Sequence, residues 1–113
     1  MSVSLTVYVV TKDVERMRQF YQEALQVKPA AQQGAWLPFS LGGATFALHA
    51  AGSETADELQ TYSLSFGVDD IDAVVSRFQS QGAKTLRGVA DEAFGMMATL
   101  EDLDGRVFEV VQY

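Results

Sequence analysis

Apolar and polar residues alternate near residue 66 and then change to a helical spacing. Leu64, Phe66 and Val68 alternate with small or polar residues, which predicts a strand buried mainly on one face. The apolar residues that follow have the i, i+3, i+4, i+7 spacing of one helix face, and they are Ile71, Val74, Val75 and Phe78. The sequence therefore predicts a strand that leads directly into an amphipathic helix.

Polar residues and a glycine mark the two ends of this helix. Asp69 or Asp70 supplies an N-cap oxygen, and Asp72 places a carboxylate in the first turn, where the helix dipole favours it. Gly82 is expected to end the helix, because glycine takes a positive φ without strain.

The same strand–helix pattern occurs 57 residues earlier in the chain. Its alternating apolar residues are Leu5, Val7 and Val9. At this offset the capping residue Asp13 falls on Asp70, and Tyr21 in the helical stripe falls on Phe78. A repeat of this kind indicates two copies of one module.

Further strands are predicted after each helix. They span residues 27–31 (where Pro29 confines the strand to an edge), 35–41, 44–50, 83–88, 94–100 and 107–111. Gly42 and Gly43 form the turn between two of them. We therefore expect an α+β fold of two tandem βαβββ modules in a single domain, residues 1–113. Module one covers residues 1–50, a linker covers 51–60, and module two covers 61–113.

Composition narrows the possible functions. The chain has 113 residues, the size of one domain, and it has no cysteine. The absence of cysteine excludes disulfides, a thiolate zinc site and a cysteine nucleophile. The net charge of −7 disfavours nucleic acid as a partner, because there is no basic face to displace counterions from phosphates. This negative charge would weakly attract a cationic small molecule. The alternative is that it only keeps the protein in solution.

The N-terminal residues alternate and lack a basic segment before a long apolar run. They therefore predict a strand and not a signal peptide. No apolar stretch approaches the length of a membrane span. We expect a cytoplasmic protein with neither a membrane nor a nucleic-acid partner.

Four segments in this order resemble the vicinal oxygen chelate superfamily, which includes glyoxalase I, bleomycin-resistance and fosfomycin-resistance proteins and extradiol dioxygenases. They are DVERMRQFYQEAL, LGGATFALH, SFGVDDIDAVVSRFQSQGA and FGMMATLEDLDGRVFEV. In the last segment Leu103 replaces the proline of the family's turn. The resemblance implies a curved mixed-sheet cup with helices on its outer face. A ferredoxin-like or dimeric α+β barrel has a similar element count and is the alternative fold.

The resemblance implies which side chains face the cup and which face the helices. The residues expected inside are Thr6, Tyr8, Ser63, Ser65 and Gly67. Those expected to pack on the helices are Leu5, Val7, Val9, Leu64, Phe66 and Val68.

The superfamily's enzymes hold a divalent metal with four residues on inner strand faces. The resemblance places these positions at Thr6, near Ala47, at Ser63 and at Glu109, with His49 two residues beyond Ala47. Only Glu109 matches, and hydroxyl groups are poor ligands for such metals. We therefore expect no metal cofactor. The alternative is nickel, zinc, manganese or iron held by Glu109 and His49, completed by a partner subunit.

Glu109 and His49 each have a second interpretation. Glu109 either binds a cationic or hydroxylated ligand, or acts as a base, or pairs with Arg106, Arg87 or another basic side chain. Glu109 is the best candidate for a catalytic residue, and the sequence assigns it no reaction. His49, the only histidine, is either a packed or solvated side chain or part of the site.

Aromatic residues complete the candidate site. Tyr8, Trp36 and Phe94 fall where metal-free members that the chain resembles line a drug pocket. The ligand-binding candidates are Thr6, Tyr8, Trp36, His49, Ser63, Phe94 and Glu109.

Three functions follow from these candidates. The first is metal-independent binding of a small aromatic or cationic molecule, such as an antibiotic, by a homodimer. The second is a metal-dependent lyase, glutathione transferase or dioxygenase. The third is an interaction domain whose cup is filled by side chains. We favour the first, in which the protein is not an enzyme.

Overall fold

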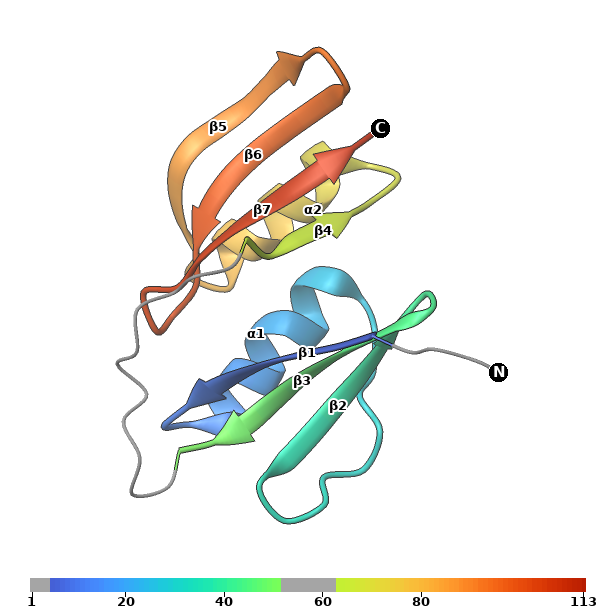
Figure 1. The fold of residues 1–113 in the computed structure, drawn as a ribbon. Coiled ribbons are helices and arrows are strands. Elements are labelled where there is room, and N and C mark those ends of the chain that lie inside the picture. Colours follow the sequence, from blue (N-terminus) through green and yellow to red (C-terminus); the bar gives the residue numbers. More distant parts are fainter. Residues whose placement is uncertain (1–4, 52–62) are drawn as a thin grey trace. The chain divides into compact units, whose positions relative to one another are not determined.

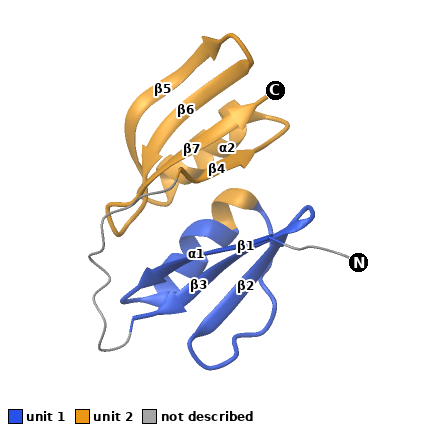
Figure 2. Cartoon of the chain, in the orientation of Figure 1, with its two compact units in different colours: residues 1–22, 26–58 blue, residues 23–25, 59–113 orange. Residues whose placement is uncertain are grey.

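A computed structural model describes residues 5–51 and 63–113, which form two compact units (Figure 2). Unit 1 contains β1 (Leu5–Thr11), most of α1 (Val14–Leu25), β2 (Trp36–Leu41) and β3 (Ala44–Ala50). Unit 2 contains β4 (Ser65–Gly67), α2 (Ile71–Ser80), β5 (Lys84–Glu92), β6 (Gly95–Glu101) and β7 (Val107–Gln112), together with residues 23–25 at the end of α1.

Unit 1 is a three-stranded mixed sheet with a helix on one face (Figure 1). The strand order is β1-β3-β2, with β1 parallel and β2 antiparallel to β3. The helix α1 begins as predicted, since the Asp13 carboxylate accepts a hydrogen bond from the Arg16 amide at 3.0 Å. It ends at Gln26, which adopts the left-handed conformation with φ 59°.

Aromatic rings connect α1 to the sheet of unit 1. The ring of Tyr21 meets that of Phe46 on β3 edge to face, with 4.9 Å between centroids. Phe46 in turn lies 6.0 Å from Phe39 on β2. Val9 and Leu48 are buried on the same side of the sheet. The helix-facing side of the sheet is therefore the hydrophobic core of this unit.

Unit 2 repeats this plan with a fourth strand (Figure 1). The order is β4-β7-β6-β5, with β4 parallel to β7 and the other pairs antiparallel. Asp70 is the N-cap of α2 and accepts from the Ala73 amide at 3.2 Å. Gly82 follows the helix with φ 100°, as the sequence predicts.

Three phenylalanines form the corresponding contact in unit 2. The ring centroids of Phe78 on α2 and Phe108 on β7 are 4.8 Å apart, and those of Phe108 and Phe66 on β4 are 5.8 Å apart. Tyr21 and Phe78, which the repeat aligns, thus both pack on the strand that runs parallel to the first strand of their unit. The α+β class and the repeated strand–helix plan are confirmed.

A charged turn joins β6 to β7. The side chain of Asp102 is fully buried, and it accepts hydrogen bonds from the amides of Asp104 and Arg106 at 2.9 and 3.0 Å. The Arg106 guanidinium donates a hydrogen bond to the other carboxylate oxygen of Asp102 at 2.6 Å. The turn therefore keeps its shape with leucine at position 103, since the Asp102 carboxylate satisfies its backbone amides.

Two local expectations were wrong. Residues 27–31 form no strand, and there the Ala30 amide donates to the Pro38 carbonyl at 2.9 Å. Unit 1 is therefore βαββ, because Pro29 lacks the amide proton that a ladder needs. Leu5 is 62% exposed instead of packing on the helix, since it begins the edge strand β1.

One predicted segment lies mostly outside the described residues, and one predicted strand is longer than expected. Most of the predicted linker, 52–60, lies outside them. The strand predicted at 83–88 extends to Glu92. None of the helices in the described ranges is both long enough and apolar enough to cross a membrane.

The ring contact between Phe78 and Phe108 generates a prediction about stability. Phe78→Ala should lower the free energy of unfolding by about 3–5 kcal/mol, because it leaves a cavity beneath two aromatic rings. Urea denaturation followed by circular dichroism measures the change. Ser76→Ala, on the exposed face of α2, is the control and should change it by less than about 0.5 kcal/mol. A loss for Phe78→Ala as small as that of the control would contradict this account of the core.

Candidate functional site

Each unit has one sheet face turned away from its helix. Phe46 and Phe108 face the helices, so the next residues on these strands, Ala47 and Glu109, point to the opposite face. Strand register then identifies their neighbours on that face. Tyr8 and Pro38 flank Ala47, whereas Ser65 and Thr99 flank Glu109.

The open face of unit 1 carries a cluster of three rings, one from each strand. Tyr8 comes from β1, His49 from β3 and Trp36 from β2. The centroids of Tyr8 and Trp36 are 5.5 Å apart, those of Tyr8 and His49 5.8 Å, and those of Trp36 and His49 6.2 Å. Tyr8 is 53% exposed, and the other two rings are half-buried. The structure therefore brings together three residues that sequence analysis identified as separate ligand-binding candidates.

A hydrogen bond orients the His49 ring in this cluster. Its Nδ1 lies 2.8 Å from the carbonyl oxygen of Ala50. A carbonyl can only accept, so Nδ1 carries the proton and donates. In the neutral ring Nε2 is then the acceptor. His49 thus presents an aromatic edge with a fixed tautomer.

The open face of unit 2 carries a polar row across all four strands. Register aligns Ser65 on β4, Glu109 on β7, Thr99 on β6 and Arg87 on β5. The Ser65 hydroxyl lies 3.4 Å from Glu109 Oε1, a long hydrogen bond. Glu109 is half-buried between two residues that carry hydroxyl groups.

The two arginines considered as partners of Glu109 are paired elsewhere. Arg87 lies 2.6 Å from Glu92 on the same strand, across an irregular stretch of β5. Arg106 lies 2.6 Å from Asp102 in the turn before β7. Among the described residues, no ion pair involves Glu109. The interpretation of Glu109 as one half of a structural ion pair with either arginine therefore finds no support.

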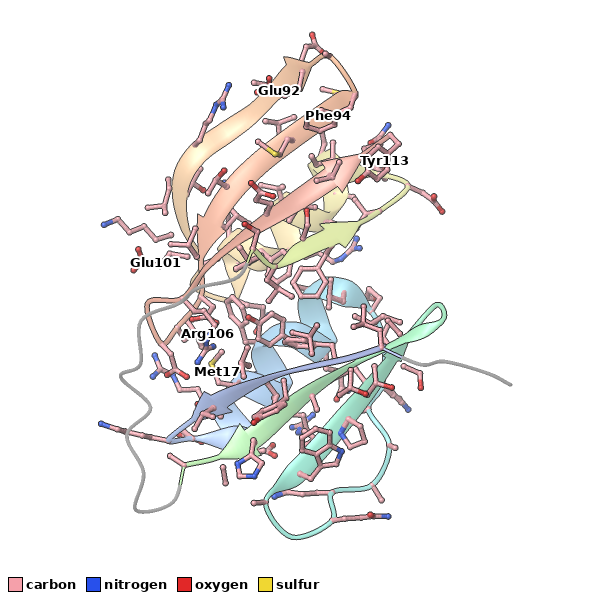
Figure 3. All side chains as sticks on the ribbon, viewed as in Figure 1. Met17, Glu92, Phe94, Glu101, Arg106 and Tyr113 are labelled. Atoms are coloured by element: carbon pink, nitrogen blue, oxygen red, sulfur yellow. The ribbon has the colours of Figure 1, made fainter. Side chains whose placement is uncertain are left out.

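Phe94 belongs to a different part of unit 2. It lies in the turn between β5 and β6, where its ring is 6.2 Å from that of Tyr113 (Figure 3). Phe94 is 52% and Tyr113 is 86% exposed. Figure 3 shows Glu92, Phe94 and Tyr113 at one end of the sheet and Glu101 at the other end of β6. Phe94 thus lies at the rim of the polar face.

The hydroxyl candidates have different surroundings. Thr6 is exposed on β1 and is paired with Thr45 on β3. Ser63 is exposed and precedes β4, so Ser65 and not Ser63 is the hydroxyl beside Glu109.

The residues at the expected metal positions do not fit a divalent metal. Thr6 and Ser63 offer only hydroxyls, and Ala47 offers no donor. His49 belongs to unit 1 and Glu109 to unit 2. Within residues 5–51 and 63–113, no group of three or more His, Cys, Asp or Glu side chains is arranged to hold a metal ion.

Sequence reasoning missed Thr99 and Tyr113. Thr99 alternates with buried Ala98 and Leu100, which was a readable sign that it faces the open side. Its position beside Glu109 depended on the register of β6 against β7, which no local signal specifies.

This protein is an α+β protein built from two strand–helix modules. In each module a helix covers one face of the sheet, and the candidate residues lie on the other face. A family model described as the Glyoxalase/Bleomycin resistance protein/Dioxygenase superfamily matches residues 4–110. The chain belongs to this superfamily. No curated protein matches the sequence significantly.

Solved structures with this fold are similar along their whole length. An antibiotic binding protein, TnmS3 from Streptomyces sp. CB03234, is 26% identical, with a TM-score of 0.75, covering 99% of this chain and 96% of its own. A family enzyme from Burkholderia phytofirmans PsJN is 20% identical, with a TM-score of 0.80 and 95% coverage of both chains. The fosfomycin resistance protein FosX from Mesorhizobium loti is 19% identical, with a TM-score of 0.75, covering 99% of this chain and 92% of its own.

The surroundings of Glu109 and Asp102 predict that removing the charge of Asp102 destabilises the protein far more than removing the charge of Glu109. Glu109→Gln should change the free energy of unfolding by less than about 0.5 kcal/mol, because no described cation is paired with it. Asp102→Asn should cost about 3 kcal/mol, because it breaks a buried pair with Arg106. Urea titrations of both variants at pH 7 measure these changes. A loss above about 2 kcal/mol for Glu109→Gln would show that Glu109 has a structural role.

Proposed function

We propose that this protein binds and sequesters a small, flat, aromatic or cationic molecule of the antibiotic type, without a metal ion. The observation that carries the proposal is the cluster of Tyr8, Trp36 and His49 on the open face of unit 1. Rings held outside the helix-facing core are available to a ligand at little further ordering cost.

The cluster suits a flat ligand with delocalised electrons. Indole and phenol rings stack on aromatic planes, and their faces attract cations. All three rings come from neighbouring strands, so the sheet positions them before a ligand arrives. The net charge of −7 favours a cationic ligand further.

The comparison with known structures supports a ligand of the antibiotic type. TnmS3, described as an antibiotic binding protein, is 26% identical to this chain over nearly its whole length. The proposal extends that description to this chain as a hypothesis about ligand class, with no particular antibiotic assigned.

The proposal includes a homodimer, on the model of the bleomycin-resistance proteins that the sequence resembles. Sedimentation equilibrium of the purified protein tests this part separately. A monomer at all concentrations would remove the dimer from the proposal and leave ligand binding open.

Trp36 provides the direct test of binding. Proflavine, a flat aromatic cation, should quench Trp36 fluorescence, and isothermal titration calorimetry should give its affinity. Trp36→Leu should weaken binding about tenfold or more, because it removes the largest stacking surface of the cluster. Leu86→Ala removes an exposed apolar residue of β5 outside the cluster and should leave the affinity unchanged. Equal affinities for wild type and Trp36→Leu would contradict the proposal.

Metal content tests the alternative of a metal-dependent lyase, glutathione transferase or dioxygenase. The purified protein should contain no stoichiometric metal, and nickel, zinc, manganese and iron(II) should not raise its Tm. The physical reason is that a single carboxylate and a single imidazole, with hydroxyls at the other positions, bind these ions weakly. Stoichiometric metal that is lost in Glu109→Gln would instead favour a superfamily enzyme.

A further inference from the structure

Glu109 occupies the middle of an interior strand of unit 2. Its strand, β7, has neighbours on both sides, β4 and β6. On the open face these neighbours place Ser65 on one side of the carboxylate and Thr99 on the other. Residues directly opposite in adjacent strands have Cβ atoms about 5 Å apart, so all three side chains project into one area. Three oxygen-bearing side chains thus converge on one stretch of the sheet.

The hydrogen-bonding capacity of Glu109 is mostly unused by the described residues. An ionised carboxylate offers about four acceptor sites. The structure provides one contact, the 3.4 Å hydrogen bond from Ser65. Since Glu109 is half-buried, bulk water reaches the carboxylate only in part.

The neighbours of Glu109 differ from those of the other two carboxylates considered on this sheet, Glu92 and Glu101. Arg87 pairs with Glu92, and Lys84 lies opposite Glu101 in the next row of the register. The basic side chains of β5 are therefore placed against acidic residues other than Glu109. Glu109 lies between two hydroxyl-bearing residues, whereas Glu92 is paired with Arg87 and Glu101 lies opposite Lys84 in register, without an ion pair among the described residues.

An alkylammonium group complements this arrangement. It has one positive charge and three N–H donors, which match one carboxylate and two hydroxyl oxygens. A hydrogen bond between ionised groups is about twice as strong as a neutral one. A divalent metal fits less well, because it requires more charged or strongly donating ligands than a single carboxylate.

We propose that Glu109, with Ser65 and Thr99, binds the primary ammonium group of a small-molecule ligand on the open face of unit 2. This assignment rests on the proposed small-molecule binding function and specifies the chemistry of a cationic ligand. Glu109 supplies the charge, and the two hydroxyls accept the remaining N–H donors.

The test uses a pair of probes that differ in charge. 2-Phenylethylamine is a cation at pH 7, and 2-phenylethanol is its neutral counterpart. Each is titrated into the full-length ¹⁵N-labelled protein, and the amide shifts of Ser65, Thr99 and Glu109 give the site and the affinity. The amine should shift these amides and bind about tenfold more tightly than the alcohol.

Variants separate the carboxylate from the general charge of the protein. Glu109→Gln should weaken amine binding about tenfold and leave the binding of the alcohol unchanged. Glu101→Gln is the matched control, because Glu101 lies on the same face, two residues from Thr99, and is paired in register with Lys84. It should leave both affinities unchanged. Thr99→Val should weaken amine binding about threefold.

Three results would overturn this assignment. They are equal amine binding by wild type and Glu109→Gln, an equal effect of Glu101→Gln, or displacement of the amine by magnesium at equal concentration. Trp36→Leu distinguishes the two proposals. If proflavine binding depends on Trp36 while amine binding does not depend on Glu109, the ammonium site fails and the proposed function stands. If the amine depends on Glu109 while proflavine does not bind, the proposed function fails and the site remains.

Discussion

The structure depends on one contact that occurs in both units: an aromatic ring on the helix packed against an aromatic ring on the strand parallel to the first strand. Tyr21 and Phe46 make it in unit 1, and Phe78 and Phe108 make it in unit 2. This contact decides which face of each sheet is covered. Because side chains alternate along a strand, it also directs the following residues, Ala47 and Glu109, to the open face. The candidate site is therefore a consequence of core packing.

The two open faces have diverged in chemistry on this shared scaffold. Tyr8 pairs with Ala47 in unit 1, and Ser65 pairs with Glu109 at the corresponding place in unit 2. The first face gathers rings, whereas the second gathers hydroxyls around a carboxylate. A repeated module can vary in this way because the exposed residues of the open face, such as Tyr8 and Ser65, bury less apolar surface than the rings of the helix-facing core. Two types of interaction, stacking and charge, thus become available to one protein.

The arrangement of charges separates structural from candidate functional groups. Asp102 is fully buried and is satisfied by Arg106 and by backbone amides, so it holds a turn. Glu92 is paired with Arg87. Glu109 has neither kind of compensation within the described residues, although it lies on an interior strand. The contrast shows why partners, and not burial alone, indicate where a carboxylate is available for a ligand.

The sequence by itself determined the elements and their repeat. Alternation, helical stripes, Asp13 and Asp70 as caps and Gly82 as a terminator are local signals, because they depend on residues a few positions apart. It overestimated one strand, at Pro29, where a missing amide proton outweighed the expected repeat. Only the tertiary structure decided which nominated residues meet. The cluster of Tyr8, Trp36 and His49, and the row that places Thr99 beside Glu109, depend on strand register, which long-range packing sets and no short stretch of sequence encodes.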